Sequence, residues 1–342
     1  MRAALFHEFG GIDKIVVEDV ETPKPLPNEV LIKVGACALN HLDVDFREGI
    51  SRFPVDPGGV FGLELAGEIV EVGSAVSDEW KVGDRVAPYL MGIDLNNIYA
   101  RTGRENLAAI DFIGITRGGG YAEYSAIPES HLVRIPDGLS YADAAATQIA
   151  FGTAFHMLFT RGRLAIGETV LINSVGSGIG SAAVQLAAMS GARIIGTSSG
   201  DDKLEAAKKF GMHHGINYTK QDIVEEVMRI TDGAGAHLTY EHVGGDLFTA
   251  GLHSLGKDGR LVTCGGHSGE VVPVDMIPLF RMQWQIIGSF TYTKGEYQTV
   301  MQMVADGKLK PLVDTEVPLE DIRKAFERME SRGHFGKIVV VP

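Results

Sequence analysis

A glycine-rich stretch, Gly176-Ser177-Gly178-Ile179-Gly180, carries the clearest chemical signal in the sequence. It follows the apolar run from Thr169 to Ile172 and precedes small and aliphatic residues at helical spacing up to Ala188. Glycines at a strand-to-helix turn let the backbone approach a diphosphate, whose charge is stabilised by free N–H groups at the helix N-terminus. Since a second apolar run follows at Arg193 to Thr197, the pattern predicts a dinucleotide-binding unit rather than a plain tight turn.

The residues after that second strand indicate which dinucleotide binds. An NAD site places an Asp or Glu here, and its charge repels a 2′-phosphate. This sequence has Thr197-Ser198-Ser199-Gly200 instead, whose hydroxyls and amides suit a phosphate, and Lys203 and Tyr218 can complete the pocket. We therefore predict NADPH as the cofactor, with NADH the weaker ligand. The alternative, in which Asp201 or Asp202 turns back to the ribose, stays open, although acidic residues also commonly begin a helix.

Composition excludes several classes of protein. The chain has 342 residues, 45% hydrophobic and 22% charged, which is typical of a globular protein of two domains. Its formal charge of −13 gives no general attraction to nucleic acid or acidic lipid, and no apolar run reaches the length of a membrane span or a signal peptide. Two distant cysteines, Cys37 and Cys264, exclude a disulfide framework. We expect a cytoplasmic protein without nucleic-acid or membrane partners.

The two parts of the chain differ in their secondary-structure pattern. Up to about residue 125, short strands are predicted between Gly, Pro and Asp turns, at 3–6, 14–18, 29–36, 65–72 and 84–88. From Ser140 a helix runs to Phe159 with a break near Gly152, and strands then alternate with helices. The fold class is therefore α/β: a small, partly open β-barrel beside a doubly wound parallel sheet of six strands. We assign residues 1–148 with 293–342 to the first domain and residues 149–292 to the second.

Several motifs in this order resemble the medium-chain dehydrogenase/reductase superfamily. They are GLELAGEIVEVGSAV with WKVGDRVAP, the TGREN segment, GGGYAEYSAIP and VLINSVGSGIGSAAVQLA. The resemblance covers nearly the whole chain and implies a GroES-like barrel domain joined to a Rossmann domain. That superfamily contains both zinc alcohol dehydrogenases and zinc-free quinone oxidoreductases. The resemblance is specific for the superfamily and much less specific for the substrate.

The positions of the catalytic zinc ligands distinguish these two branches. Zinc binds three or four Cys, His or carboxylate ligands in proteins. In the zinc branch the ligands are a Cys three residues before an Asp, the His of a GHE triplet and a Cys in the helix before the nucleotide domain. The matching residues here are Asn40, Leu63 and Ile149. We therefore predict that the protein binds no zinc at this position.

The structural zinc lobe of the family lacks its ligands as well. Aligned on the TGRE segment, the four cysteines of the family fall on residues without a thiol, namely Asp94, Asn97, Ala100 and Ala108. Packing or subunit contacts must then hold the lobe. Cys37 is expected to be a small buried hydrophobic residue. The spacing His41-x-Asp43-x-Asp45 could also bind a metal, although one His and two carboxylates so close in sequence more often form a hydrogen-bonded turn.

Without a Lewis acid, the resemblance favours reduction of an electron-poor acceptor over alcohol oxidation. The candidate catalytic residues are Asn40, His41 and Asp43, in a loop after a strand. By analogy with the quinone oxidoreductases, Asn40 contacts the nicotinamide ribose or the substrate, and His41 is the candidate proton donor; a turn histidine is the alternative. Glu64 is expected to be a buried carboxylate paired with a basic group, and Tyr121 is expected to be a packing residue.

The remaining cofactor contacts follow from the resemblance and the expected strand ends. They are predicted at Thr153, Val243, Gly265, Ser289, Phe290 and Lys337, where Lys337 approaches the diphosphate. We predict a zinc-independent, NADPH-dependent oxidoreductase acting on a quinone or an α,β-unsaturated carbonyl, assembled as a homodimer or homotetramer. Two alternatives remain: an NAD(P)-dependent alcohol dehydrogenase, and an NADPH-binding structural or sensing protein without turnover.

Overall fold

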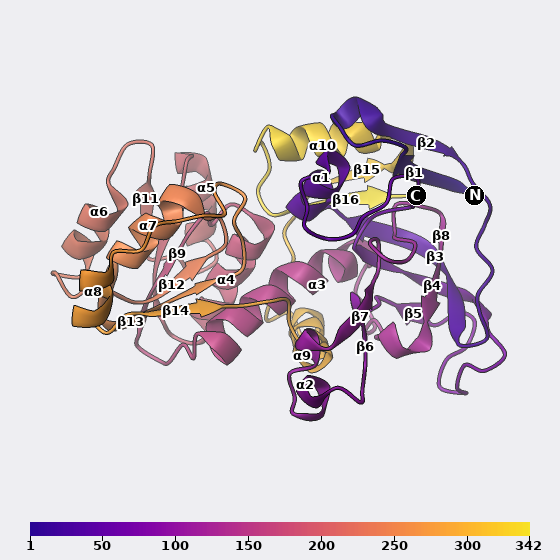
Figure 1. The fold of residues 1–342 in the computed structure, drawn as a ribbon, viewed down its shortest axis with the longest axis horizontal. Helices are drawn as coiled ribbons and strands as arrows, with labels where there is room; N and C mark the ends of the chain where they lie inside the picture. The colour runs from indigo at the N-terminus through magenta and orange to yellow at the C-terminus, as the bar shows by residue number, and fades with distance from the viewer. The chain divides into compact units, whose positions relative to one another are not determined.

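The computed structural model describes every residue from 1 to 342, and the chain divides into two compact units (Figure 1). Unit 1 comprises residues 1–149 and 293–342, and unit 2 comprises residues 150–292. The boundary falls within helix α3 (Tyr141–Phe155). None of the helices combines the length and the apolar character that spanning a membrane requires.

A parallel sheet of six strands forms the centre of unit 2, in the order β11-β10-β9-β12-β13-β14 (Figure 1). Strands are added outward from β9 in both directions, so the predicted doubly wound sheet is confirmed. The strands are β9 (Thr169–Ile172), β10 (Arg193–Ser198), β11 (His214–Asn217), β12 (Ala236–Glu241), β13 (Leu255–Thr263) and β14 (Gln285–Gly288). The helices are α4 (Gly178–Met189), α5 (Asp201–Lys208), α6 (Ile223–Ile230), α7 (Gly245–His253) and α8 (Met276–Arg281).

Apolar side chains at helical spacing fix one layer of this unit. Helix α6 places Ile223, Val227 and Ile230 on one face, and all three are buried. They pack against alternate residues of the central strands, including Leu171 and Ile195. Burial of each such side chain stabilises the fold by roughly 1.5–3 kcal/mol, so this layer holds the carboxyl ends of the strands in fixed positions.

Unit 1 is built from mostly antiparallel strands. Its main sheet has the order β15-β16-β3-β4-β5, β8 also pairs with β3, and only β15 and β16 are parallel. Two hairpins, β1–β2 and β6–β7, complete the set. The strands are β1 (Arg2–Phe6), β2 (Ile15–Asp19), β3 (Glu29–Ala38), β4 (Glu64–Val72), β5 (Arg85–Val86), β6 (Met91–Ile93), β7 (Ala109–Phe112), β8 (Tyr124–Pro128), β15 (Val313–Pro318) and β16 (Lys337–Val341).

Unit 1 also contains several short helices. They are α1 (His41–Glu48), α2 (Ile98–Arg101), α9 (Lys294–Ala305) and α10 (Ile322–Glu330), with 3₁₀ turns at Ile12–Lys14, Glu105–Leu107, Glu129–His131 and Leu319–Asp321. The register of the main sheet is important for function. Ala38, at the end of β3, pairs with Glu64 on one side and with Val339 on the other. The sheet therefore brings the end of β3, the first residue of β4 and the beginning of β16 together.

Some predicted boundaries are wrong. The helix that follows Ser140 is not broken at Gly152; it continues to Phe155 and becomes π-helical over His156–Arg161. Gly152 is required there for packing, because a Cβ atom would lie 2.7 Å from the ring of Tyr292. Asn40 and His41 do not lie in a loop, since Asn40 is the N-cap of α1 and His41 its first residue. The strand predicted at residues 84–88 comprises only Arg85–Val86, and β6, β7, β8, β15 and α8 were not predicted.

Candidate functional site

The glycine-rich stretch forms the expected strand-turn-helix junction between β9 and α4. Ser177 is the N-cap of α4, and its Oγ accepts a hydrogen bond from the Gly180 N–H at 2.9 Å. A Cβ atom on Gly180 would lie 2.2 Å from the carbonyl oxygen of Ser174, so only glycine fits. The turn is therefore tight, and α4 presents its first N–H groups beyond the end of β9. This geometry suits an anionic group such as a diphosphate.

Hydroxyl groups rather than carboxylates follow β10. Ser198 is buried and its Oγ accepts from the Gly200 N–H at 3.2 Å, while Ser199 is exposed. The aliphatic part of the Lys203 side chain packs against the glycine turn: a Cβ atom added to Gly176 would lie 2.6 Å from Lys203 Cδ. The Tyr218 N–H donates to the Ser198 carbonyl at 3.1 Å, so the ends of β10 and β11 lie together. The predicted phosphate-pocket residues are thus neighbours.

Asp201, one of the alternative ribose ligands, is already bound by other side chains. Its Oδ1 accepts from Asn217 Nδ2 and its Oδ2 from Lys220 Nζ, both at 2.5 Å. Those hydrogen bonds lower the pKa of the Asp201 carboxyl below its usual value. Its charge is therefore already balanced by a cation, which weighs against a ribose contact. Asp202 remains open as the alternative.

His242 is a functional candidate that the sequence analysis missed. Its Nε2 lies 3.0 Å from Ser177 Oγ, and its buried Nδ1 has no hydrogen-bond partner. Burial lowers the pKa of this imidazole to about 4, with a smaller contribution from His267, so the ring is neutral at physiological pH. The only sequence signal was its place just before Val243-Gly244. The Gly265 turn approaches it closely, because a Cβ there would lie 2.3 Å from the His242 carbonyl oxygen.

Glu241 holds the ends of β12 and β13 together. Its Oε1 accepts from the N–H groups of Val243 and Gly244 at 2.7 and 2.8 Å, and its Oε2 accepts from Thr263 Oγ1 at 2.9 Å. Burial raises the pKa of the Glu241 carboxyl despite these bonds. The turn that begins at Val243 is therefore anchored.

Three further residues were predicted to contact the cofactor. Thr153 is buried in α3, while Ser289 and Phe290 follow β14, and Phe290 is partly exposed. Their cofactor roles stay predictions.

The most unusual group of unit 1 is a buried ion pair at the end of β3. Lys337 Nζ lies 2.6 Å from Glu64 Oε2 and 2.8 Å from Asn40 Oδ1. Asn40 Nδ2 donates to the same carboxylate oxygen at 2.8 Å, and the Ile149 N–H donates to Glu64 Oε1. The side chains of Lys337 and Glu64 are 7% and 0% exposed. We call Asn40, Glu64 and Lys337 the lysine network.

The lysine network confirms one prediction and adds to another. Glu64 is, as predicted, a buried carboxylate paired with a basic group. Lys337 was predicted to approach the diphosphate, and that contact stays a prediction, but the acceptors that its ammonium has in this structure are Glu64 and Asn40. The backbone fixes Lys337 as well: Gly336 has φ +96°, and the Lys337 N–H donates to the Leu312 carbonyl at 2.7 Å.

Asp43 lies deep in the same unit with one oxygen unpaired. Its Oδ2 accepts from the Asn40 N–H at 2.8 Å and from Tyr121 Oη at 3.0 Å, whereas the buried Oδ1 has no partner. Burial raises the pKa of this carboxyl to about 7. Tyr121 therefore does more than pack, although its ring does contact Phe61 edge-on. Cys37 is buried as predicted, and burial raises the pKa of its thiol.

The side chains of His41 and Asp43 point in different directions, because both residues lie in the first turn of helix α1. His41 Nε2 lies 4.0 Å from Asp45 Oδ1, one turn further along α1, and the His41 side chain is 48% exposed. Residues two apart on a helix face different sides, so Asp43 points into the unit. The alternative metal set of His41, Asp43 and Asp45 is therefore not formed. His41 as proton donor stays a prediction.

The residues at the catalytic zinc positions do not suit zinc. The three residues at these positions, Asn40, Leu63 and Ile149, all lie close to Glu64. Asn40 Nδ2 and the Ile149 N–H donate to its carboxylate, and Leu63 precedes it in the sequence. They offer an amide and two aliphatic side chains where zinc requires thiolate, imidazole or carboxylate ligands. The carboxylate of Glu64 is already paired with the Lys337 ammonium, which would repel a second cation.

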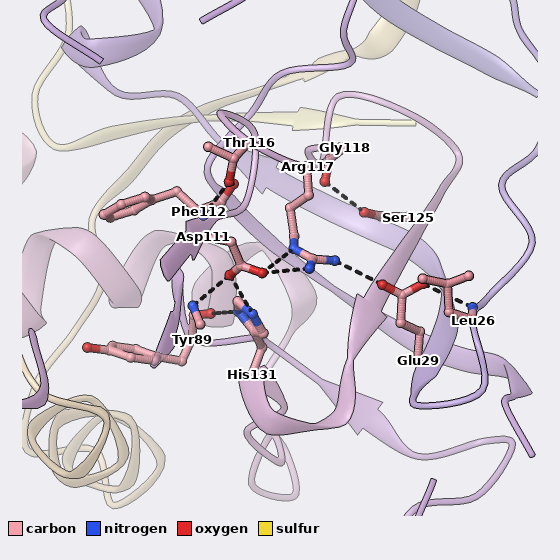
Figure 2. A network of polar contacts seen from close by, with 11 residues as sticks. Leu26, Glu29, Tyr89, Asp111, Phe112, Thr116, Arg117, Gly118, Ser125 and His131 are labelled. Carbon is pink, nitrogen blue, oxygen red and sulfur yellow. Dashed lines mark hydrogen bonds and ion pairs between the residues drawn. The ribbon is translucent and has the colours of Figure 1, made fainter. Parts of the chain in front are cut away.

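A second set of charged side chains, partly or fully buried, follows the lobe at residues 94–108 (Figure 2). The ends of this lobe are joined by a hydrogen bond from the Asp94 N–H to the Ala108 carbonyl at 3.0 Å. Asp111 Oδ2 accepts from Arg117 Nη2 at 2.6 Å, and Arg117 Nη1 donates to Glu29 at 3.0 Å. Asp111 Oδ1 accepts from the Gly92 N–H at 2.8 Å, which ties β6 to β7. We call Glu29, Asp111, Arg117 and His131 the lobe network.

His131 completes the lobe network from a fully buried position (Figure 2). Its Nδ1 donates to the Tyr89 carbonyl at 2.8 Å, and its Nε2 lies 3.0 Å from Asp111 Oδ1, off the ideal hydrogen-bond direction. Both ring nitrogens therefore face oxygen atoms. Burial alone would raise the pKa of Asp111, but the bonds from His131 and Arg117 outweigh it and hold that pKa well below its usual range.

Comparison with known proteins gives a consistent result over the whole chain. The profile described as an alcohol dehydrogenase GroES-like domain matches residues 26–137, and the profile described as a zinc-binding dehydrogenase matches residues 178–306. A relative from Sulfurisphaera tokodaii, called an NAD-dependent alcohol dehydrogenase, is 33% identical over the full length of both chains. A quinone oxidoreductase-like protein 2 homolog from Nematostella vectensis is 31% identical over 99% of this chain and 88% of its own.

Solved structures agree with these relatives. The crystal structure of an NAD-dependent alcohol dehydrogenase has a TM-score of 0.93 and 33% identity, with both chains fully covered. A mycobacterial protein solved in complex with NADPH has a TM-score of 0.85 and 27% identity, again over the whole of both chains. The names of these proteins differ in both substrate and cofactor.

Proposed function

Because the chain belongs to the medium-chain dehydrogenase/reductase superfamily of NAD(P)-binding oxidoreductases, we propose that it is a zinc-independent, NADPH-preferring reductase of quinones or α,β-unsaturated carbonyls. The observation that carries this proposal is the lysine network. Asn40, which matches one of the three ligand positions of the zinc-type relatives, is hydrogen-bonded to the ion pair of Lys337 and Glu64. Zinc would find no thiolate or imidazole ligand among them.

The choice of substrate class follows from this donor set. Oxidation of an alcohol at neutral pH requires removal of the hydroxyl proton, which zinc assists by lowering the pKa of the bound oxygen. Reduction of a quinone or conjugated carbonyl requires only that the developing charge on oxygen be stabilised by hydrogen bonds. Asn40, His41 and Asp43 are our candidate residues for substrate positioning and proton supply in this reaction.

The preference for NADPH rests on the end of β10. NADPH, when bound, supplies a hydride. Its 2′-phosphate is expected near Ser198, Ser199 and Lys203, while Asp201 is engaged by Lys220 and Asn217. The diphosphate is expected at the turn of Gly176, Ser177, Gly178 and Ile179. Tyr218, Val243 and Gly265 line the same ends of the strands.

We also propose a homodimer or homotetramer. Strand β14 is the edge of the sheet, and Ile286 on it is 39% exposed. Phe280 of the preceding helix α8 is 65% exposed. An apolar sheet edge of this kind is suited to pairing with a second copy of the chain.

The function is tested by NADPH oxidation with the purified chain against benzoquinones, conjugated enones and simple alcohols, together with elemental analysis. We expect turnover with quinones or enones and no stoichiometric zinc. Alcohol oxidation with one zinc per chain would show that the alcohol dehydrogenase alternative is correct. Bound NADPH that stays reduced against every acceptor would favour a structural or sensing protein.

Cofactor preference is tested by Ser198→Asp. The new carboxylate would lie beside the 2′-phosphate, so NADPH affinity should fall roughly 100-fold while NADH affinity changes little. Ser198→Asn is the matched control, since it adds the same volume without charge. Equal losses for both cofactors in the Asp variant would mean that the phosphate binds elsewhere.

A further inference from the structure

The ammonium of Lys337 uses only part of its hydrogen-bonding capacity. A lysine side chain carries three N–H donors. Glu64 Oε2 accepts one at 2.6 Å and Asn40 Oδ1 accepts another at 2.8 Å, and Nζ makes no third hydrogen bond in the structure. The side chain is 7% exposed, so it is nearly but not completely closed off from its surroundings. The third N–H of this buried ammonium is therefore available to a further acceptor.

The position of this donor is fixed at both ends of the side chain. At the backbone, Lys337 is the first residue of β16 and bonds to Leu312. At the tip, Glu64 is itself immobilised, because its Oε1 accepts from the Ile149 N–H and its Oε2 also accepts from Asn40. The third N–H is therefore held in place, as is required of a group that stabilises charge without reorganising.

Asn40 cannot supply such a donor. Its Nδ2 donates to Glu64 at 2.8 Å and to the Ala38 carbonyl at 3.3 Å, which uses both amide hydrogens. Its Oδ1 accepts from Lys337. The amide therefore positions the ammonium, and the only unused donor in the lysine network belongs to Lys337.

We propose that Lys337 is a catalytic residue, whose third N–H donates a hydrogen bond to the oxygen of the acceptor as negative charge develops there. This inference rests on the proposed function and deepens it: the acceptor class is one with a carbonyl or quinone oxygen that becomes anionic. Lys337 thus takes the part that a metal cation plays in zinc-type relatives.

The chemical step balances without any further reagent. For a conjugated carbonyl, the hydride from NADPH forms a C–H bond at the β-carbon, the C=C π bond breaks, and the electron pair moves to the carbonyl oxygen as an enolate. Lys337 stabilises that oxygen and keeps its own proton. A proton from solvent then adds to the α-carbon, so that enone, NADPH and one proton give saturated ketone and NADP⁺. A quinone accepts hydride and proton in the same ratio and gives the hydroquinone.

The test compares Lys337→Met with Lys337→Arg on two acceptors, a weakly activated enone and a quinone of high potential. Loss of a hydrogen bond made to the developing charge should lower kcat for the enone about 10²- to 10³-fold. The quinone needs less stabilisation, so its rate should fall only about tenfold. Lys337→Arg keeps a cationic donor and should retain more enone activity than Lys337→Met. The Kd for NADPH, measured by fluorescence, should stay within about twofold in both variants.

A double variant separates chemistry from stability, because Lys337→Met alone leaves Glu64 as a buried charge without a partner. In Lys337→Met/Glu64→Gln neither charge is present, while the amide oxygen keeps an acceptor for the Ile149 N–H. The enone defect should persist in this folded variant. Recovery of enone turnover in the double variant would overturn the proposal, since Lys337 would then serve only to neutralise Glu64.

The remaining outcomes are also decisive. A large rise in the NADPH Kd with kcat unchanged would overturn the proposal in favour of a cofactor contact. Equal losses for enone and quinone would overturn it as well, because the effect would not follow the charge on the acceptor. If the wild-type chain oxidises NADPH with neither acceptor, the proposed function and this inference fail together, whereas an active wild type with an equally active Lys337→Met variant refutes the inference alone.

Discussion

Unit 1 contains two networks of buried charge, each next to positions where zinc-type relatives hold a metal, and they differ in how completely their polar atoms are paired. In the lobe network both oxygens of Asp111 and both ring nitrogens of His131 face partners. Both oxygens of Glu29 are also occupied, by Arg117 and by the Leu26 N–H. In the lysine network one N–H of Lys337 has no acceptor. In the first, each of these atoms faces an oppositely polarised atom of the protein, although His131 Nε2 lies off the hydrogen-bond direction, and the second has room for one more acceptor.

This difference separates a structural role from a chemical one. A buried ion pair is weak evidence for stability, because the cost of removing two charges from water offsets most of their attraction. The lobe network recovers that cost through additional hydrogen bonds that cross from β3 to β7 and to the turn at His131. It ties down a lobe that carries no cysteine. The lysine network leaves one donor unsatisfied, which fits a group whose partner arrives with the substrate.

The comparison predicts the largest stability effect in the lobe network. Asp111→Asn removes the carboxylate that faces both His131 and Arg117, and leaves the Arg117 guanidinium without this counter-charge in a partly buried place. The free energy of unfolding should fall by about 3–5 kcal/mol, measured by denaturant titration. Asp94→Asn, on the lobe itself, is the control and should cost under about 1 kcal/mol, because Asp94 Oδ1 accepts only the Asn96 N–H.

The same residue predicts an acid sensitivity with a definite sign. The folded-state pKa of Asp111 lies below its unfolded value. Its stabilising effect is therefore fully present above about pH 4 and is lost as the pH falls toward the folded pKa. Unfolding of the wild type should become easier below that pH, and the Asp111→Asn variant should lack this part of the acid dependence. A variant that matches wild type in both stability and acid dependence would contradict a structural role for the lobe network.

A smaller effect is expected in the lysine network. Glu64→Gln leaves the Lys337 ammonium buried without its counter-charge, so the unfolding free energy should fall by roughly 3 kcal/mol. Removing both charges in Glu64→Gln/Lys337→Met should restore most of that loss, giving a coupling of about 2 kcal/mol in a double-mutant cycle. Additive losses would mean that the two side chains do not stabilise each other, and the comparison between the networks would then rest on geometry alone.

The sequence predicted the parts of the fold that local patterns determine. Strand Thr169–Ile172 has the predicted bounds, and strand Arg193–Ser198 extends one residue past the predicted run, because β-branched runs between turn residues are local signals. Helix α1 was missed, since its eight residues mix charged and apolar side chains after a strand end. Strand β15, with the sequence VDTEVP, was missed because alternate residues are charged and it lies at the edge of its sheet.

The sequence could identify candidate residues for the site but not their partners. Asn40, Glu64 and Lys337 were all singled out, yet Lys337 is 273 residues from Glu64 and its pairing depends on the register of β3, β4 and β16. His242 was missed because nothing in the local sequence says that its ring meets Ser177. Long-range contacts of this kind arise from the tertiary fold, which no local pattern contains.

The smallest predicted effect concerns Asp43, which adjoins the lysine network and also has an unpaired atom, Oδ1. Burial raises its pKa from 3.8 to about 7, with Lys337 lowering and Glu64 raising that value. Between pH 4 and 7 the unfolded chain releases this proton while the folded chain keeps it, so the wild type loses stability as the pH rises through this window.

Asp43→Asn stays neutral throughout and keeps an acceptor for the Asn40 N–H and Tyr121 Oη. Relative to wild type, the variant should therefore gain roughly 2 kcal/mol of unfolding free energy between pH 4 and pH 8, measured by denaturant titration at each pH. Asp13→Asn, at a side chain that is 76% exposed, is the matched control and should show no such gain. A difference between Asp43→Asn and wild type that does not change with pH would mean that the carboxyl is already ionised in the folded protein. The charge of Lys337, which lowers the pKa of Asp43, would then act on a second carboxylate besides Glu64.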